Sequence, residues 1–495
     1  MKKVLLVNWD CYPNCASGGV YSWTKALIDN ISDWQFIVVN QLSNPNCNGN
    51  YTIPKQVIQV IEIPIFGSNR YEEYYCEKKS LIGKILRTSD SIIKEEFIPL
   101  YREFIDLVLT AYCEPRDLCE IIFKLHKFLI KYDTKKCFEH RLCWQVFMQK
   151  ILSDPLYRHM TLKEALMAFQ MIQRNMQLLS LEIPKVDIVH CSLAWIPSFI
   201  AICAKMEYNC PVIITEHGVA FRELLLYYNA YMHDESSKIF WKVFSRNIVT
   251  TIYSIADLIT PVCNANANWE EELHADKSTI KVIYNGVDTK KFRPMNIQKT
   301  QNKPTVVCVG RIEVFKDIIC LIQAIKYVKE SITDIQCLIY GGSTDLAYSI
   351  RCLESVKSLH LEDTVKFMGV TREPEKIYNE ADVVAISSIS EGFPFAVIEA
   401  MACGKAIVAA DVGGVKEALQ ECGILVQSRH PQELAKAIVM LLKDKKLREE
   451  LGKLATQRVL NEFTLMRSVD GFLEQYKSLT IQKKQNPEPK VGVVQ

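Results

Sequence analysis

Short apolar runs alternate with amphipathic stretches along most of this chain. The runs at residues 3–7, 36–39 and 57–63 are rich in Val, Leu or Ile, and polar turn residues follow them. The same pattern resumes at residues 186–191 and continues to about residue 460, with helical periodicity between the runs. Short β-branched runs separated by helical stretches predict parallel strands joined by crossover helices, which is the α/β class of fold.

Residues 71–181 interrupt this alternation with long helical periodicity and little strand pattern. Pro99, Pro115 and Pro155 divide the stretch into about five predicted helices, because proline ends or kinks a helix. The segment is too long for a simple crossover and predicts a helical insertion in the first domain. Its role stays open among shaping an acceptor pocket, docking a partner and packing on the sheet.

A polar stretch without apolar periodicity, residues 291–303, separates the two α/β halves. A chain of 495 residues is too long for one ordinary core. We therefore predict a first domain over residues 1–290 and a second over residues 304–462. A final helix follows at residues 463–480, and the polar tail at residues 481–495 is predicted to be disordered.

The amino-acid composition, with 49% hydrophobic and 23% charged residues, is that of an ordinary globular protein. A net charge of +2 argues against a general nucleic-acid binder. No apolar run approaches the ~20 residues of a membrane-spanning helix. The first ten residues resemble a signal peptide only briefly, because the chain turns polar at Asn8 without a small-residue cleavage site. These features predict a cytoplasmic protein.

The chain has 18 cysteines, and none forms the paired C-x2-C sets of a structural zinc site. Several, including Cys308, Cys337 and Cys403, lie inside apolar strand or helix patterns. Buried reduced thiols that act as small hydrophobic side chains are the favoured interpretation. The sequence predicts no metal ligand set.

One segment, residues 383–417, combines the elements of a ligand site. It contains an apolar strand, a polar turn, a helix, a second strand at residues 407–410 and a Gly-Gly turn. Pro394 suits the first turn of the helix, and Gly404 suits its end. A turn at the carboxyl end of a parallel strand is where open α/β sheets bind ligands, and a helix N-terminus favours a phosphate.

Glu391 and Glu399 stand in this segment, eight residues apart. A carboxylate accepts hydrogen bonds from two neighbouring hydroxyl groups, so the pair could hold hydroxyl-rich parts of one ligand. The alternative is a charge before the helix and an exposed helical glutamate. Taken alone, the two residues leave both interpretations open.

The stretch Glu391-Gly-Phe-Pro-Phe-Ala-Val-Ile-Glu399 resembles the E-x7-E signature of retaining GT-B glycosyltransferases of family 4, also called group 1. The resemblance implies two Rossmann-like domains that face a cleft, with the acceptor domain first and the nucleotide-sugar donor domain second. It assigns Glu391 to the donor sugar, Glu399 to the ribose, and Gly392, Phe393 and Pro394 to donor binding. It also implies that the final helix returns to the first domain.

Arg311 and Lys316 follow the first strand of the second domain. Two positive charges there would stabilise a departing diphosphate. Their Gly-Arg-x4-Lys spacing matches the pyrophosphate-binding pair of family 4, although Asp317 stands where many members have glycine. The resemblance further places Gly341 at the nucleotide and backbone groups of residues 368–371 at the base.

The first domain offers Gly18-Gly19-Val20, which matches the family's turn at the helix facing the donor phosphates. A predicted strand at residues 211–215 delivers His217, which by itself fits a hydrogen-bonded loop histidine as well as a catalytic one. The resemblance makes His217 the catalytic candidate that faces the donor sugar. The residues assigned to the acceptor are Glu216, Arg222 and Glu223.

The implied reaction moves a sugar from a nucleoside diphosphate sugar, with UDP favoured, to a saccharide acceptor with retention. His217, Arg311, Lys316 and Glu391 form the catalytic set, and the leaving phosphate helps to deprotonate the acceptor. No D-x-D motif lies at a strand end, so neither metal nor cofactor is expected. The insertion together with Thr215-Glu216-His217-Gly218 most resembles the PelF-like branch, linked to extracellular polysaccharide synthesis. Resemblance to that branch implies that the protein could associate peripherally with a membrane polysaccharide export complex. No nucleic acid is expected as a partner.

Two other interpretations fit the same architecture. A sugar-nucleotide epimerase or a glycogen-type synthase would use the same donor site. A scaffold subunit would keep the fold without catalysis, but it would not need Arg311, Lys316, Glu391 and Glu399 together.

Overall fold

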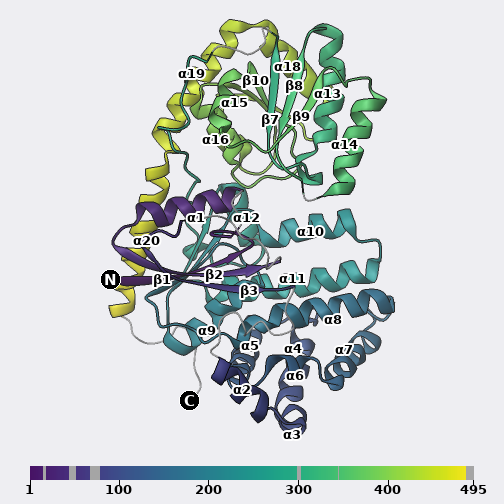
Figure 1. Cartoon of the computed structure of the whole chain (residues 1–495), viewed down its shortest axis with the longest axis vertical. Coiled ribbons are helices and arrows are strands. Elements are labelled where there is room, and N and C mark those ends of the chain that lie inside the picture. Colours follow the sequence, from purple (N-terminus) through teal and green to yellow (C-terminus); the bar gives the residue numbers. More distant parts are fainter. Residues whose placement is uncertain (15–17, 44–51, 67–77, 298–302, 344, 486–495) are drawn as a thin grey trace. The chain divides into compact units, whose positions relative to one another are not determined.

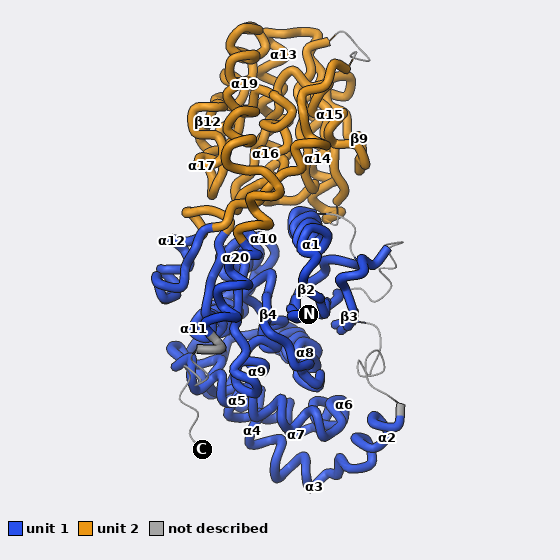
Figure 2. The backbone as a smooth tube through the Cα atoms, turned by 90° about the vertical axis from the view of Figure 1, so that its left-hand side faces the viewer, with its two compact units in different colours: residues 1–261, 267–282, 472–495 blue, residues 262–266, 283–471 orange. Residues whose placement is uncertain are grey.

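The computed structural model describes residues 1–14, 18–43, 52–66, 78–297, 303–343 and 345–485. Within these ranges the chain forms two compact units (Figure 2). Unit 1 comprises residues 1–261, 267–282 and 472–495, and unit 2 comprises residues 262–266 and 283–471. Each unit is built on its own sheet and core (Figure 1).

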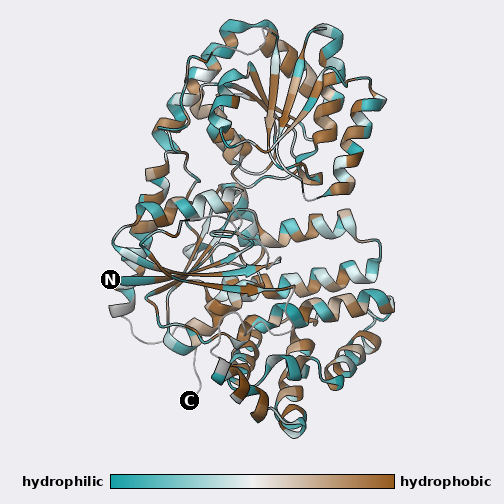
Figure 3. Cartoon of the chain, in the orientation of Figure 1, coloured by the Kyte–Doolittle hydropathy of each residue, from teal (hydrophilic) through white to brown (hydrophobic). Residues whose placement is uncertain are grey.

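Unit 1 holds a six-stranded sheet in the order β3-β2-β1-β4-β5-β6. Every described pairing in it is parallel. The strands are β1 (Lys2–Trp9), β2 (Trp34–Leu42), β3 (Val57–Pro64), β4 (Ile188–Cys191), β5 (Val212–Glu216) and β6 (Leu258–Pro261). The predicted apolar runs fall on these strands (Figure 3). The strands other than the edge strand β3 are largely buried, because helices cover a parallel sheet on both faces.

The crossover helices of unit 1 are α1 (Gly19–Asn30), α9 (Phe199–Tyr208), α10 (Ala220–Tyr231), α11 (Glu235–Ile255) and α12 (Asn264–Glu272), whose first residues belong to unit 2. The apolar pattern at the start of residues 280–288 favours a strand that runs into a turn. No strand forms there, since Val287 makes a single bridge to Thr464 and Ile280 makes a single bridge to Ile259 of the sheet. Beyond that bridge the segment forms no ladder with the sheet.

The insertion between β3 and β4 is helical, as predicted. Its elements are α2 (Lys78–Arg87), α3 (Asp90–Ile92), the π-helix η2 (Ile93–Phe97), α4 (Ile98–Val108), α5 (Pro115–Leu129), α6 (Thr134–Phe138), α7 (Arg141–Ser153), α8 (Leu162–Met176) and the 3₁₀ turn η3 (Gln177–Ser180). Helix α5 packs against α9 and α11, so the insertion shares the core of unit 1.

The prediction that Pro99 separates two helices is wrong. The chain stays helical from Asp90 to Val108, and Pro99 is the second residue of α4. A π-helical turn precedes it, in which the Ile98 N–H donates to the carbonyl of Ile93. This wider turn accommodates the proline ring, which would otherwise meet the carbonyl four residues earlier.

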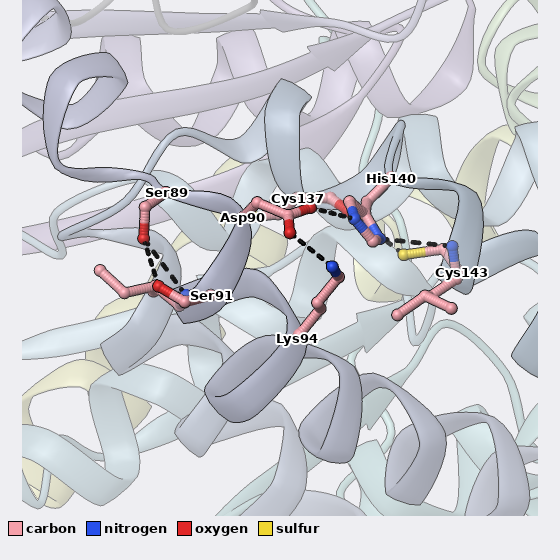
Figure 4. Close-up of polar contacts among 9 residues, drawn as sticks. Ser89, Asp90, Ser91, Lys94, Cys137, His140 and Cys143 are labelled. Carbon is pink, nitrogen blue, oxygen red and sulfur yellow. Dashed lines mark hydrogen bonds and ion pairs between the residues drawn. The ribbon is translucent and has the colours of Figure 1, made fainter.

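Polar contacts connect α3, η2, α6 and α7 within the insertion (Figure 4). Asp90 forms an ion pair with Lys94 and accepts from His140 Nε2 at 3.0 Å, and both contacts lower the pKa of its carboxyl group. The Cys143 thiol donates to the carbonyl of Cys137 at 3.2 Å. These contacts join α3 to the start of α7 and have an evident structural role.

Unit 2 repeats the architecture with a parallel sheet in the order β12-β11-β10-β7-β8-β9. Its strands are β7 (Thr305–Val309), β8 (Gln336–Tyr340), β9 (Val365–Gly369), β10 (Val383–Ile386), β11 (Ala406–Ala410) and β12 (Ile424–Val426). Its helices are α13 (Ile318–Ser331), α14 (Leu346–Ser358), α15 (Pro374–Glu380), α16 (Phe395–Ala402), α17 (Val415–Leu419), α18 (Pro431–Lys443) and α19 (Lys445–Glu462).

The last helix, α20 (Leu465–Gln485), begins in unit 2 and continues in unit 1 from Phe472. Its Phe472 and Tyr476 side chains are buried in unit 1. The Asn285-Gly286-Val287 motif meets the start of α20, because Val287 N–H donates to the Phe463 carbonyl at 2.9 Å. A Cβ at Gly286 would overlap the backbone of Thr464, so only glycine fits there.

Each described cysteine is buried, and no disulfide forms among the described residues, in agreement with the sequence interpretation. Burial raises the pKa of the Cys308 thiol to about 12, which keeps it protonated. Across the described ranges, no group of three or more His, Cys, Asp or Glu side chains is placed to hold a metal ion. None of the described helices has both the length and the apolar character that crossing a membrane requires.

Candidate active site

The strand order of unit 2 reverses between β7 and β10, because β8 and β9 extend one side of β7 and β10 to β12 extend the other. Ligands of open α/β sheets bind beside such a point, at the carboxyl ends of the strands. Lys316 follows β7 and Glu391 follows β10, and the Lys316 Nζ donates to Glu391 Oε1 at 2.6 Å. The structure therefore brings two predicted donor-site residues into direct contact.

Backbone and hydroxyl groups hold these two loops together. The Ile389 N–H donates to the carbonyl of Phe315, and the Ser387 hydroxyl donates to the carbonyl of Lys316, both at 2.8 Å. The Ser388 hydroxyl donates to Glu391 Oε1 at 2.6 Å. Two donors to Oε1 thus fix the orientation of the Glu391 carboxylate beside Lys316.

The Gly413-Gly414 turn after β11 supports the Glu391 loop from its other side. Gly413 has φ +54°, and a Cβ there would overlap the carbonyl oxygen of Glu391. The Gly414 N–H donates to the Gly392 carbonyl at 2.7 Å. Both positions need glycine because the backbone of the Glu391 loop approaches too closely for a side chain.

The remaining motif residues, Phe393 and Pro394, are buried and connect the loop to α16. Asn285 Nδ2 donates to the Phe393 carbonyl at 2.9 Å. Helix α16 begins at Phe395 with Pro394 as its N-cap, so it contains Glu399 but not Glu391. The two glutamates therefore do not share one helix, while Gly404 ends the region in the left-handed conformation at φ +69°, as predicted.

Glu399 lies one turn into α16, and its Oε2 accepts from the Tyr378 hydroxyl at 3.1 Å. Burial raises the pKa of the Glu399 carboxyl group to about 7. The Tyr378 hydrogen bond and the charge of Lys291 oppose that increase. Glu399 therefore changes charge near neutral pH, a property common at functional sites.

Arg311 extends from the end of β7 with 68% of its side chain exposed, and its Nη1 pairs with Glu313 Oε1 at 2.8 Å. The backbone beside it is tightly packed, since a Cβ at Gly341 would overlap the carbonyl oxygen of Gly310. The Gly341 N–H in turn donates to the Gly369 carbonyl at 2.9 Å. The ends of β7, β8 and β9 thus lie side by side, with Arg311 directed to solvent.

Asp317, where the family resemblance implies glycine, forms the turn before α13. It adopts the left-handed conformation at φ 44° and ψ 51°, and its side chain accepts from the Cys320 N–H as the N-cap of α13. Aspartate tolerates this conformation better than most residues because its short polar side chain bonds locally. It therefore holds a turn whose backbone conformation favours glycine.

In unit 1, His217 follows β5 and is half-buried. The indole ring of Trp23, in α1, lies against its imidazole with ring centroids 4.7 Å apart and planes at 71°. Gly18 is the N-cap of α1 at φ +107°, and Gly19 is the first helical residue. The two predicted parts of the unit 1 site, the glycine turn and His217, are thus linked through one helix.

Glu216 is fully buried, and its role in the structure is to tie backbone segments together. Its Oε1 accepts from the N–H of Ala194 and its Oε2 from the N–H of Ala220, both at 2.7 Å. Burial raises the pKa of Glu216 to about 8 and that of the neighbouring, fully buried Glu270 to about 10. Glu216 joins the loop after β4 to the start of α10 and holds the backbone that carries His217.

The other residues assigned to an acceptor lie on the first turn of α10. Arg222 is half-buried, and Glu223 is exposed. The Glu223 carboxylate lies over Gly218, where a Cβ would overlap it. These positions leave Glu223, rather than Glu216, facing outward from this part of unit 1.

Sequence reasoning missed several side chains that build these sites: Trp23, His190, Asn285, Tyr378 and Ser388. Ser388 was detectable as a hydroxyl three residues before Glu391. The others carry no local signal, because their contacts join residues far apart in the chain.

Two family descriptions match this chain. Domain of unknown function (DUF3492) matches residues 2–278, which is more than half of the chain. Glycosyl transferases group 1 matches residues 290–458, the range that contains the Lys316–Glu391 pair and Glu399.

Curated relatives are similar over part of the chain. A D-inositol 3-phosphate glycosyltransferase of Corynebacterium urealyticum is 28% identical over 325 residues, which cover 61% of this chain and 73% of the relative. Another, from Rhodococcus erythropolis, is 31% identical over 223 residues, and this match spans 42% of this chain and half of the relative.

Two solved structures cover 97% of this chain and 100% of their own. Sucrose-phosphate synthase from Thermosynechococcus elongatus gives a TM-score of 0.63 at 17% identity. HepE from Anabaena, in complex with UDP and glucose, gives 0.60 at 15% identity. These likenesses establish the fold and confirm the predicted GT-B class. The chain is a group 1 glycosyltransferase of family 4, and its residues 2–278 belong to the DUF3492 family.

Proposed function

We propose that this protein transfers a sugar from a UDP-sugar to a hydroxyl group of a saccharide acceptor, with retention at the anomeric carbon. The observation that carries the proposal is the Lys316–Glu391 pair at the reversal of strand order in unit 2. A cation and a carboxylate in contact there fit a donor that presents a diphosphate beside a hydroxyl-rich sugar.

Lys316 and Arg311 would act on the leaving group. The bond to the anomeric carbon breaks as negative charge accumulates on the departing diphosphate, so fixed positive charge lowers the barrier. Lys316 is held by the Glu391 loop, while Arg311 is 68% exposed and can exchange Glu313 for a phosphate. Two such cations supply the charge that a metal would otherwise supply, and we propose a metal-independent reaction.

Glu391 and Glu399 would bind the two hydroxyl-bearing parts of the donor. Glu391, which Lys316 and Ser388 orient through Oε1, would accept a hydrogen bond from the sugar. Glu399 would accept from the ribose hydroxyls beside its Tyr378 contact. The start of α16 lies between them, where no described side chain caps the helix and N–H groups would meet phosphate.

The choice of nucleotide and acceptor rests on analogy. HepE was solved with UDP and glucose, and its likeness in fold supports UDP here. Extracellular polysaccharide synthesis, as in the PelF-like branch, rests on the helical insertion together with Thr215-Glu216-His217-Gly218. His217 would contact the transferred sugar, and residues of the first turn of α10 would meet the acceptor.

The test is nucleotide release from a panel of UDP-, GDP- and ADP-sugars by the full chain, with and without a chelator. We expect slow, chelator-resistant release of UDP from one UDP-sugar, and its loss in Glu391→Ala. Glu449→Ala is the matched control, because Glu449 forms a surface ion pair with Lys445 within α19. Release unchanged in Glu391→Ala would contradict the site, and no release with no thermal stabilisation by any nucleotide would favour a scaffold.

A further inference from the structure

Five rings gather around the carboxyl ends of β4 and β5 in unit 1. Trp23 lies 5.3 Å from His190 and 5.4 Å from Phe472, measured between ring centroids, in addition to its 4.7 Å contact with His217. Tyr476 lies 5.7 Å from His190. Trp23 is only 4% exposed, so its position is fixed by packing on several sides.

A buried chain of hydrogen bonds fixes the histidine beneath Trp23. The Thr260 hydroxyl donates to the Ile214 carbonyl at 3.3 Å, so the Thr215 hydroxyl must donate to Thr260 Oγ1 at 2.6 Å. Thr215 therefore accepts from His190 Nε2–H at 2.7 Å, which leaves Nδ1 to accept from the Tyr476 hydroxyl at 2.7 Å. The chain of donors runs in one direction, from α20 across β4 and β5 to β6.

This arrangement makes His190 a rigid, neutral support. Burial, with the charge of His217 as a smaller cause, lowers the pKa of His190 to about 3. Both ring nitrogens are used in hydrogen bonds, so the ring cannot rotate without breaking one of them. The side of Trp23 that contacts His190 therefore rests on a fixed surface, while another side contacts His217.

We infer that Trp23 is a positioning residue that holds the imidazole of His217 in its reactive orientation, with Tyr476 and His190 fixing Trp23 in turn. The inference rests on the proposed function, in which His217 contacts the transferred sugar. It gives the end of α20 within unit 1 a part in catalysis. It also explains why Trp23 lies on the helix that begins at Gly18 and Gly19.

The chain offers a matched control in Trp34, the first residue of β2. Trp34 is 3% exposed and packs against Tyr476 with ring centroids 5.2 Å apart and planes at 48°, and among the described ring contacts it does not touch His217. Trp23→Leu and Trp34→Leu remove equal volumes from the same unit. Both should lower the melting temperature, but only Trp23→Leu should change the behaviour of His217.

The experiment compares kcat, the donor KM and the histidine NMR signals of the full chain. With the UDP-sugar that the release panel identifies, we expect Trp23→Leu to lower kcat ~10- to 100-fold at a nearly constant donor KM, since misorientation of a catalytic group has effects of that size. Trp34→Leu should stay within about threefold of wild type after correction for folded fraction. Trp23→Phe should restore part of the rate, and the His217 ring signals should move in the Trp23 variants but not in Trp34→Leu.

A second variant tests the inference even if Trp23→Leu does not fold. Tyr476→Phe keeps the ring and removes only the hydroxyl that donates to His190, and we expect a smaller fall in kcat with a shifted His190 signal. Equal losses of kcat in Trp23→Leu and Trp34→Leu, with unmoved His217 signals, would contradict the inference. Trp23 would then contribute only to the packing of the core. An inactive wild-type protein would instead count against the proposed function, and the NMR comparison would still decide the positioning.

Discussion

The two units share one topology but differ in what they place at the carboxyl ends of their strands. In each sheet, two strands lie on one side of the unit's first strand and three lie on the other. Unit 2 places charged groups there, with Lys316 and Glu391 in contact and Arg311 mostly exposed. Unit 1 places buried groups there that are kept neutral, including His190 and Glu216.

The difference indicates a division of labour that topology alone does not set. Charges near solvent can be offered to an anionic ligand, whereas a buried neutral network gives rigidity to the groups around it. Unit 2 is accordingly suited to a nucleoside diphosphate, and unit 1 to holding one imidazole in a defined orientation. The following substitutions test that contrast.

The largest effect should come from Lys316→Ala, which removes a fixed positive charge from the proposed leaving group. We expect kcat to fall ~10²- to 10³-fold, because the loss of one donor to a developing anion costs this much in other enzymes. UDP binding, measured by calorimetry, should weaken in the same variant. His217→Ala should lower kcat without weakening the binding of UDP. An equal loss of UDP affinity in both variants would contradict the proposed difference in role between the two units.

Gly413→Ala tests the close approach that supports the Glu391 loop. The substitution forces alanine to φ +54° and places a Cβ into the Glu391 carbonyl, so we expect a loss of about 2–3 kcal/mol in stability. Gly83→Ala is the matched control in α2, where the Cβ would meet only the Arg87 side chain at 3.9 Å. Alanine there should raise stability by up to ~1 kcal/mol. Thermal unfolding measures both, and a neutral Gly413→Ala would contradict the packing argument.

The pH dependence of donor binding should report Glu399. Its pKa is raised to about 7, so below that pH the carboxyl group is protonated and must lose a proton before it accepts from two ribose hydroxyls. Affinity for an intact UDP-sugar should rise with pH up to about 7, by up to tenfold per unit, and then level off. Glu399→Gln should bind more weakly and show no such rise. The same slope in both proteins would place the titrating group elsewhere.

Most of the fold was predictable because its signals are local. Apolar runs such as residues 383–386 become interior strands through their own side chains, and Gly404 ends a helix through its own conformational freedom. The errors arose where neighbours decide the outcome. The helix through Pro99 depends on a π-helical turn, and residues 280–288 lack a ladder although their apolar pattern favours one.

The residues of the candidate site likewise fall into those that the sequence predicts and those that it does not. The spacing of Arg311, Lys316, Glu391 and Glu399 was visible in the sequence, since each residue follows a strand or lies in a helix that the sequence predicts. The surroundings that orient them were not visible. Tyr378 reaches Glu399 across 21 residues, and Tyr476 reaches His190 across 286, so only the folded chain shows these contacts.

We expect the smallest effect at Asp317, an aspartate in a left-handed conformation that favours glycine. Asp317 both adopts φ 44° and caps α13, so the two contributions can be separated by two substitutions. Asp317→Gly loses the cap but relieves the left-handed backbone, and we expect stability within about 0.5 kcal/mol of wild type. Asp317→Ala loses the cap and keeps the strain, for a loss of about 2 kcal/mol. Lys316 precedes this turn, so UDP release should follow the same order, with Asp317→Gly close to wild type. Equal stability of the two variants would mean that the backbone conformation at 317 carries little strain, and that the side-chain cap alone maintains the turn beside Lys316.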